Sequence, residues 1–198
     1  CYSEIYRETP PIGILEAARD LNEEQGGGFA NIIVLNSLSK RSNLAGLRCG
    51  FVAGQAELMD DFAMLRAYGG AQIPGPLQAA GAALWADEVH VRDNRALYAR
   101  LVEVAEEELG HLPGYQRPEA AFFLWLDVAK SGLSGEEAAQ RLWREQAVKV
   151  MAGRYMSRPG ADGRSPGDDF IRIALVFDEA VTREACRRIA QLLESGGR

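Results

Sequence analysis

Cysteine, histidine and lysine are the scarce residue types of this sequence. The three cysteines, Cys1, Cys49 and Cys186, are far apart and form no pair with metal-binding spacing. With only two histidines, the chain has little room for a zinc site or a histidine-based catalytic triad. Scattered thiols of this kind are typical of a reducing compartment, so we expect a cytoplasmic protein that binds no metal.

Long apolar runs and clustered positive charge are also missing. No stretch reaches the about 18 consecutive apolar residues that a membrane-spanning helix needs, so we expect no membrane partner. The formal net charge is −6, which argues against nucleic acid as a partner because neutralising phosphates takes clustered Lys and Arg. The 198 residues, 47% of them hydrophobic, are enough to build a sizeable apolar core.

Two further features of the sequence are its first residue and its small number of lysines. The chain begins at Cys1, without a methionine and inside a β-prone run over residues 1–6, so we expect it to be a piece of a longer protein. Only three of its 22 basic residues are lysines, namely Lys40, Lys130 and Lys149. In so lysine-poor a chain, a lysine in an unusual sequence context is a candidate for reactive chemistry.

Apolar patterns in the first half of the chain predict an α/β fold. The continuous apolar run over residues 30–35 predicts a strand buried on both faces of a parallel sheet, and residues 50–53 predict a second buried strand. Helices are predicted over residues 13–21 and over 77–109, the latter with a bend near 85–87. A further amphipathic helix is predicted over residues 55–68, with three side chains turned inward: Leu58, Phe62 and Leu65.

The second half alternates strands and helices. Its predicted strands cover residues 121–128, 148–151 and 170–175. Its predicted helices cover 134–146 and 179–193. The first of these helices begins with Ser134 and Glu137 in capping-box spacing.

Lys40 stands directly after the first predicted strand, in Ser37-Leu38-Ser39-Lys40. Ligand sites of open α/β folds gather at the carboxyl ends of strands, where loops aim side chains at a bound molecule. Arg48 follows eight residues later, just before Gly50. Two hydroxyls, an amine and a guanidinium around one pocket suit a phosphate monoester that also carries an aldehyde.

The run Ser37-Leu38-Ser39-Lys40, followed by Arg48 and Gly50, resembles the pyridoxal-phosphate lysine signature of the class I and II aminotransferases, which have fold type I. Residues 1–6 resemble the end of a strand that carries an Asp-Glu-x-Tyr sequence in this family, cut just after the Asp-Glu pair. Residues 121–126 and 170–175 resemble two strands of the family's small domain. The resemblance covers essentially the whole chain, but only the C-terminal half of a family member.

The resemblance implies an α/β fold in two parts. Residues 1–87 are expected to be the C-terminal part of the large cofactor-binding domain, which has a mostly parallel sheet with helices. Residues 88–198 are expected to be an α/β small domain. Family members act on amino acids and 2-oxo acids as homodimers, so the resemblance also implies these substrates and a second copy of the chain as partners.

Roles for individual residues follow from the same resemblance. Lys40 is expected to bind pyridoxal 5′-phosphate covalently and to move a proton at the substrate Cα. Tyr2 is expected to donate a hydrogen bond to the phenolic oxygen of the cofactor. The phosphate is expected to contact Ser37 and Arg48, with Ser39 as a weaker candidate beside them.

The substrate is expected to contact arginines. Arg172 lies within an apolar strand and matches the arginine that clamps the substrate α-carboxylate, a task for which Lys is a poor substitute. The run Lys40-Arg41-Ser42-Asn43 resembles the bacterial N-succinyldiaminopimelate aminotransferases of lysine biosynthesis. That substrate carries several carboxylates, for which Arg41 and Arg154 are the candidate additional contacts.

Several parts of the family's cofactor site do not occur in these 198 residues. They are a glycine-rich phosphate loop, a stacking aromatic residue, an Asn, and the Asp that pairs with the pyridine nitrogen. We therefore expect the isolated chain to be inactive as a transaminase. Alternative functions are another aminotransferase, for aspartate or aromatic substrates, a pyridoxal-phosphate C–S lyase, or the cofactor-sensing domain of a transcription regulator.

Overall fold

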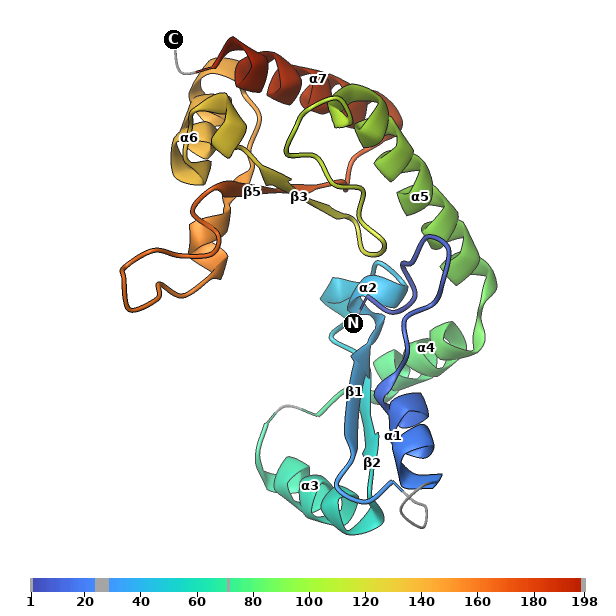
Figure 1. Ribbon diagram of the computed structural model, residues 1–198. Coiled ribbons are helices and arrows are strands. Elements are labelled where there is room, and N and C mark those ends of the chain that lie inside the picture. Colours follow the sequence, from blue (N-terminus) through green and yellow to red (C-terminus); the bar gives the residue numbers. More distant parts are fainter. Residues whose placement is uncertain (1, 24–28, 71, 197–198) are drawn as a thin grey trace. The chain divides into compact units, whose positions relative to one another are not determined.

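The computed structural model describes residues 2–23, 29–70 and 72–196, and it contains two compact units, Cys1–Arg95 and Ala96–Arg198 (Figure 1). Helices and strands occur in both units, which confirms the α/β class. The division into part of a large domain and a small domain at residues 87 and 88 stays a prediction, because compactness alone does not assign a unit to a domain of a larger protein. The units are described separately below.

The first unit contains one pair of strands among its described residues. β1 (Ile33–Ser37) runs antiparallel to β2 (Gly50–Gly54), with Ile33 opposite Gly54 and Ser37 opposite Gly50. The predicted burial on both faces of a parallel sheet is therefore wrong for residues 30–35, and Leu35 is 68% exposed. The apolar run does form a strand, but the number and direction of its neighbours depend on other parts of the chain.

The helices of the first unit form close to where they are predicted. α1 (Ile14–Glu23) and α3 (Ala56–Tyr68) lie beside the strand pair in Figure 1. α3 has no buried residue, and Leu65 is 66% exposed, so the predicted inward position of Leu65, like that of Phe62, is wrong. Sequence periodicity predicts a helix but cannot say whether another element covers its apolar side chains.

The predicted bend in the long helical region is confirmed. α4 (Gly75–Ala86) ends before Asp87, and α5 (Val89–Leu109) begins two residues later. The Asp87 side chain accepts a hydrogen bond from the Val89 N–H at 2.7 Å, which caps the first turn of α5.

The N-terminal run does not form the predicted strand. Cys1 lies outside the described residues, and residues 2–5 form a turn in which the Ile5 N–H donates to the Tyr2 carbonyl at 2.9 Å. Ile5 is 1% exposed, so the turn is held by a buried apolar side chain. The β propensity of residues 1–6 predicts an extended strand. No strand among the described residues forms a ladder with this segment, so the propensity alone does not make it part of a sheet.

The second unit has its own sheet and core. β3 (Phe123–Asp127), β5 (Phe170–Ala174) and β4 (Met151–Ala152) form an antiparallel sheet with β5 in the centre. The predicted strand over 148–151 is shorter and shifted, because only Met151 and Ala152 pair with β5. α7 (Glu179–Ser195) lies on one side of this sheet in Figure 1. Residues less than 2% exposed include Leu124, Leu126, Ile171, Ile189 and Leu192.

Helix α6 (Gly135–Gln146) begins with the predicted capping box. The Ser134 Oγ accepts from the Glu137 N–H at 3.2 Å, and the Glu137 carboxylate accepts from the Ser134 N–H at 3.0 Å. These reciprocal bonds satisfy two backbone donors that a helix start otherwise leaves open. They also lower the pKa of Glu137, chiefly through the bond from the backbone of Ser134.

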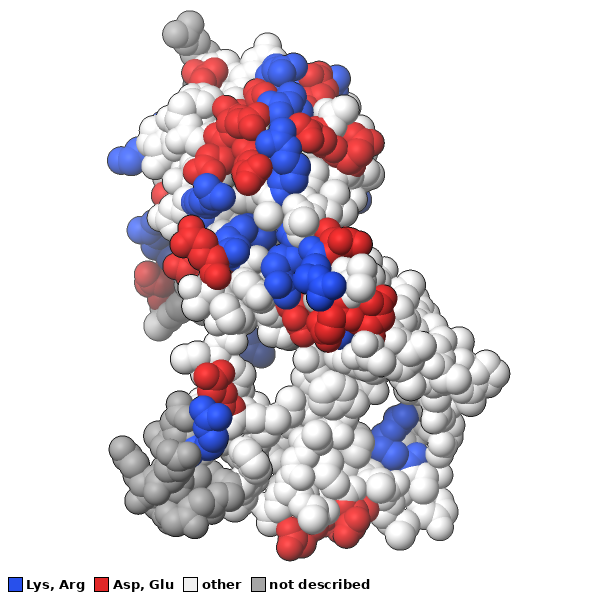
Figure 2. Space-filling view, turned by 90° about the vertical axis from the view of Figure 1, so that its right-hand side faces the viewer, with Lys and Arg blue, Asp and Glu red and all other residues white. Residues whose placement is uncertain are grey.

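A network of ion pairs joins α5 to α7 on the surface of the second unit. Positive and negative side chains alternate over the upper part of Figure 2, and the pairs include Arg183 to Glu107 at 2.7 Å and Arg100 to Glu179 at 2.6 Å. The hydrogen bond from Arg183 lowers the pKa of Glu107, and the bond from Arg100 lowers that of Glu179. Networks of this kind contribute more than isolated surface pairs do.

None of the helices in the described part of the chain combines the length and the apolar character that crossing a bilayer requires.

We expect Ser134→Ala to lower the free energy of unfolding by about 1 kcal/mol, because it removes the N-cap acceptor of α6. Urea denaturation followed by circular dichroism measures the change. Gln140→Ala, at an exposed position of the same helix, is the matched control and should leave the midpoint unchanged. Equal midpoints for the two variants would contradict the role of the cap.

We also expect acid to weaken the second unit in a way that depends on this ion-pair network. A lowered folded-state pKa means that the folded state binds protons less tightly than the unfolded chain. The contribution is therefore complete above the ordinary carboxyl pKa of 4.5 and is lost as the pH falls through the lowered value. Urea midpoints at pH 7 and below pH 4.5 measure it, and Arg183→Gln should reduce the difference. A pH dependence identical in both proteins would exclude the network as its source.

Candidate functional site

Lys40 lies on a short helical turn that begins at the end of β1. Ser37 is the last residue of the strand and caps α2 (Leu38–Arg41), and its side chain accepts from the Ser39 N–H at 3.3 Å. Figure 1 shows α2 at one end of the strand pair. Serine is favoured here because its hydroxyl satisfies a free backbone donor of the helix start. The strand and its cap thus present Lys40 one helical turn beyond the sheet.

Pairing between the strands brings Arg48 beside this turn. The Leu38 N–H donates to the Cys49 carbonyl at 3.1 Å, which extends the β1–β2 pairing past the end of β1. Gly50 is required opposite Ser37, because a Cβ at this position would lie 2.5 Å from the Asn36 carbonyl oxygen. The pairing of β1 with β2 therefore explains why Arg48 and Gly50 stand at these positions after Lys40.

The Arg48 side chain is exposed and available to an anion. Its backbone has a φ of 54°, in the left-handed region, and its Nη1 donates to the Ala45 carbonyl at 2.9 Å. Among the described residues Arg48 forms no salt bridge. An exposed guanidinium that pairs with no carboxylate among the described residues is a suitable partner for a phosphate.

Tyr2 and Lys40 are brought together, although 37 residues separate them in the sequence. The Lys40 Nζ lies 5.7 Å from the centre of the Tyr2 ring, and both residues are half-buried. The predicted N-terminal strand is a turn, but this turn still places Tyr2 beside the lysine.

The structure buries Arg41, the residue after Lys40. Its side chain is 3% exposed and forms ion pairs with Glu88 at 2.6 Å and Glu4 at 3.3 Å. Its guanidinium also lies over the Trp85 ring, with 5.3 Å between the guanidinium carbon and the ring centre. The substrate contact assigned to Arg41 stays a prediction. The contacts described for its guanidinium are those with Glu88, Glu4 and Trp85.

The other two predicted arginines lie in the second unit. Arg172 is half-buried on β5, opposite Trp125, with its guanidinium carbon 4.7 Å from the centre of the Phe123 ring. It forms no salt bridge with any described residue. Its charge is therefore not balanced by a carboxylate of the described chain.

Arg154 has acidic neighbours instead. Its side chain is 43% exposed, and it pairs with Asp168 at 3.4 Å and with Glu136 at 3.7 Å. Both contacts are long for a charge-assisted hydrogen bond, and they leave the guanidinium partly in water. A bound carboxylate at Arg154 would compete with these two side chains.

Sequence reasoning missed the side chains that hold the segment after Lys40. Glu4, Glu88, His90 and Asn94 all contact residues 41–43. Their positions in the sequence give no signal, because they lie in two other segments that only folding brings to Lys40. A buried arginine needs carboxylate partners, and this requirement could have pointed to Glu4 and Glu88. The sequence does not show that Arg41 is buried, so the requirement could not be applied.

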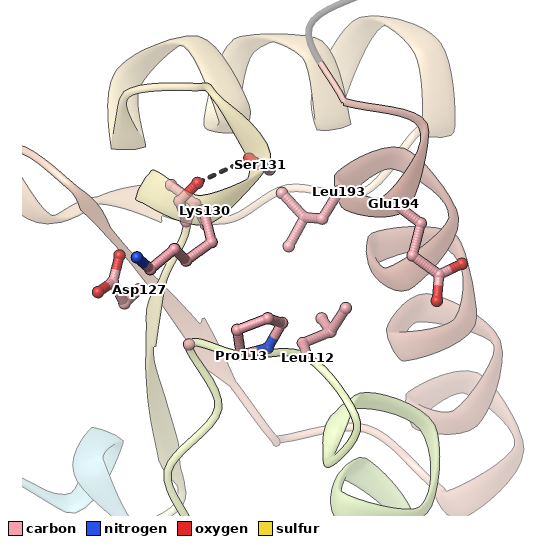
Figure 3. Close-up of a pocket in the computed structure, with 9 residues that line it drawn as sticks. Leu112, Pro113, Asp127, Lys130, Ser131, Leu193 and Glu194 are labelled. Carbon is pink, nitrogen blue, oxygen red and sulfur yellow. Dashed lines mark hydrogen bonds between the residues drawn. The ribbon is translucent and has the colours of Figure 1, made fainter.

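Two cavities of the described structure differ in whether a predicted site residue lines them. An open cleft of about 590 Å³ lies along the strand pair and includes Ser37, Gly50 and Arg66. A second cavity, of about 230 Å³ and shown in Figure 3, lies in the second unit between Pro113, Lys130 and Leu193. No predicted site residue lines this second cavity. Across the described residues no three His, Cys, Asp or Glu side chains gather into a metal site.

The groups around Lys40 fit pyridoxal phosphate by their chemistry. The turn offers an amine for an aldehyde, and Tyr2 offers a phenol beside it. Ser37, Ser39 and the exposed guanidinium of Arg48 offer donors for a phosphate dianion. The donor set therefore suits a small aromatic aldehyde that carries a phosphate.

Comparisons with known proteins support this assignment. The family model described as "Aminotransferase class I and II" matches residues 2–189. Members of this family use pyridoxal phosphate. A curated relative, the 4-dedimethylamino-4-oxo-anhydrotetracycline transaminase of Streptomyces rimosus, is 32% identical over 94% of the chain and 48% of its own length.

Solved structures show the same relation. An aminotransferase from Neisseria meningitidis superposes with a TM-score of 0.87 and 39% identity, over 97% of this chain and 47% of that one. A probable N-succinyldiaminopimelate aminotransferase from Thermus thermophilus gives a TM-score of 0.75 and 27% identity, over 96% and 48%. The chain thus spans about half the length of the proteins it matches. On the match over residues 2–189, the chain belongs to the class I and II aminotransferase family.

Proposed function

We propose that the whole protein is a pyridoxal-phosphate-dependent aminotransferase that moves an amino group between an amino acid and a 2-oxo acid. The observation that carries this proposal is the turn at the end of β1, which presents Lys40 beside Tyr2 and close to the exposed Arg48. As in other aminotransferases, we propose that two copies of the protein form a homodimer.

Lys40 is proposed as the catalytic residue. When bound, pyridoxal phosphate supplies an aldehyde for amines and a ring that accepts electron density from the substrate Cα. The Lys40 amine is proposed to hold and move the proton at that carbon, as a general acid and base.

The remaining groups of the turn orient the cofactor. Arg48 and the hydroxyls of Ser37 and Ser39 are proposed to bind its phosphate, and the Tyr2 hydroxyl to donate to its ring oxygen. These contacts fix the ring relative to Lys40, which reduces the entropy that the reaction would otherwise lose.

We expect pyridoxal phosphate followed by borohydride to label the 198-residue chain once, at Lys40. Lys130 and Lys149 are exposed and act as internal controls, because neither has a phosphate-binding turn beside it. Intact mass measurement on the 21.6 kDa chain counts the adducts, and peptide mapping locates them. Lys40→Ala should abolish the label. Adducts spread over the other two lysines of a folded sample would contradict the assignment. Absence of an adduct on the 198-residue chain is followed by the same measurement on the full-length protein, where its absence would contradict the assignment.

The proposed amino-group acceptor is N-succinyl-2-amino-6-oxopimelate, with glutamate as the donor. Two observations support this choice. The Lys40-Arg41-Ser42-Asn43 sequence resembles that branch, and a protein similar in fold is described as a probable N-succinyldiaminopimelate aminotransferase. Arg172, whose charge no described carboxylate balances, is the proposed clamp for the α-carboxylate. Arg154 is the proposed contact for a second carboxylate of the substrate.

In the full-length protein, we expect Arg154→Ala to lower kcat/KM for the succinylated substrate about tenfold and to leave that for aspartate nearly unchanged. The reason is the loss of one charge-assisted contact that only the longer substrate makes. Arg172→Ala is the comparison variant and should lower both values, since every amino acid carries the α-carboxylate. An Arg154→Ala enzyme that discriminates between the two substrates as the wild type does would remove Arg154 from the substrate site.

A further inference from the structure

The three residues that follow Lys40 each contact the junction of α4 and α5. Arg41, Ser42 and Asn43 lie at the end of α2 and just after it, while their partners lie within residues 85–94. No part of this arrangement belongs to the proposed cofactor or substrate contacts of Lys40, Tyr2 or Arg48. The cluster therefore needs a separate explanation.

Arg41 forms the first and most buried of these contacts. Its Nη2 donates to Glu88 Oε1 at 2.6 Å and to the Trp85 carbonyl at 3.3 Å. Its Nη1 lies 3.3 Å from Glu4 Oε1, and Glu4 follows Tyr2 by two residues. The bond from Arg41 lowers the pKa of Glu88, so this carboxylate stays ionised at neutral pH. One guanidinium thus joins the lysine turn, the tyrosine turn and the start of α5.

His90 makes the second contact. Its Nε2 lies 2.8 Å from the hydroxyl of Ser42, and its Nδ1 lies 2.8 Å from Asp87 Oδ2. Asp87 accepts from the ring, which lowers the pKa of its carboxyl, and so fixes the orientation of the imidazole. Ser42 is 7% exposed, which makes this bond one that water does not readily replace.

Asn94 makes the third contact. Its Oδ1 accepts from Asn43 Nδ2 at 3.1 Å, and its Nδ2 donates to the Arg41 carbonyl at 3.4 Å. Asn43 has a φ of 53°, in the left-handed region, so the chain reverses direction at this point. The amide of Asn94 therefore contacts the residues on both sides of Ser42, the backbone of Arg41 and the side chain of Asn43.

A helix of four residues cannot hold its own shape in water, because helix nucleation is costly. At its start α2 is held by the Ser37 cap and by the bond from Leu38 to Cys49. At its end it is held by the bond from the Leu44 N–H to the Leu38 carbonyl at 3.3 Å and by the contacts of residues 41–43. The orientation of Lys40 between these two ends therefore depends on the contacts with residues 85–94.

We propose that the α4–α5 junction positions Lys40 by holding the three residues that follow it. This inference rests on the proposed function of Lys40. Arg41, His90 and Asn94 are positioning residues in this proposal, because they act through the segment that follows Lys40. In this assignment Arg41 supports the site from inside the protein.

The test compares the reactivity of the three lysines of the 198-residue chain toward an amine-acylating reagent. In the wild type, half-buried Lys40 should react more slowly than the exposed Lys130 and Lys149. In Glu88→Ala we expect the rate at Lys40 to rise about threefold relative to those two lysines, because the partner of Arg41 is lost. Amide hydrogen exchange over residues 38–44 should rise with it. Glu88→Gln, which keeps an acceptor for Arg41, should restore part of the wild-type rate.

Two further variants make the result decisive. Glu145→Ala removes an ion pair of similar length in the other unit, that of Arg141 at 2.8 Å, and should leave the Lys40 ratio unchanged. Asn94→Ala removes two contacts without exposing a buried charge, and decides the question if Glu88→Ala does not fold. An unchanged Lys40 ratio and unchanged exchange in the folded variants would overturn the proposal.

Reduction with pyridoxal phosphate, run in parallel, separates this inference from the function on which it rests. A Lys40 adduct in the wild type, together with unchanged reactivity in the variants, would refute the positioning role and leave the cofactor assignment standing. Changed reactivity in the variants, without any adduct on either the 198-residue chain or the full-length protein, would support the positioning role and refute the cofactor assignment.

Discussion

Burial of the Arg41 guanidinium is the constraint around which the first unit is organised. A positive charge removed from water is costly unless carboxylates balance it, and Arg41 is only 3% exposed. The two carboxylates that do so, Glu4 and Glu88, come from opposite ends of the unit's sequence. Satisfying one charge therefore brings together three segments of the chain, and two of them carry Tyr2 and Lys40.

Backbone pairing between β1 and β2 also positions the turn that carries Lys40. The antiparallel β1–β2 pair sets the register in which Ser37 lies opposite Gly50, and the bond from Leu38 to Cys49 extends it into the lysine turn. As a result the segment directly after Arg48 pairs with the start of the lysine turn. The candidate site combines a hydrogen-bonded strand pair with a short turn that is held by its neighbours at both ends.

The two units differ in how much apolar surface they bury. The second unit packs α7 and its antiparallel sheet around fully buried residues such as Leu126 and Ile189. In the first unit, Leu35 of the strand pair and Leu65 of α3 remain largely exposed. An isolated pair of strands is at best marginally stable in water. This contrast agrees with a chain that spans about half the length of the aminotransferases it matches.

Much of the fold could be predicted from local patterns. The helix starting with Ser134 and Glu137, the strand around Leu124 and the break before Val89 all form at or close to the predicted residues. These predictions succeed because caps, apolar periodicity and helix breaks act over a few residues. The local structure of the lysine turn follows from equally short-range features, since its serine cap, lysine and arginine lie within twelve residues, while their roles toward the cofactor stay a proposal.

Only the tertiary structure decided which faces of the strands and helices are buried and which charged side chains form ion pairs. The run over residues 30–35 encodes a strand, but its antiparallel partner and its exposure depend on which other strands are present. The sequence likewise determined that Arg41 carries a charge beside Lys40, while folding determined that Glu4 and Glu88 neutralise it. Local preferences are written in neighbouring residues, whereas burial and ion pairing are properties of distant segments brought into contact, so only the folded chain specifies them.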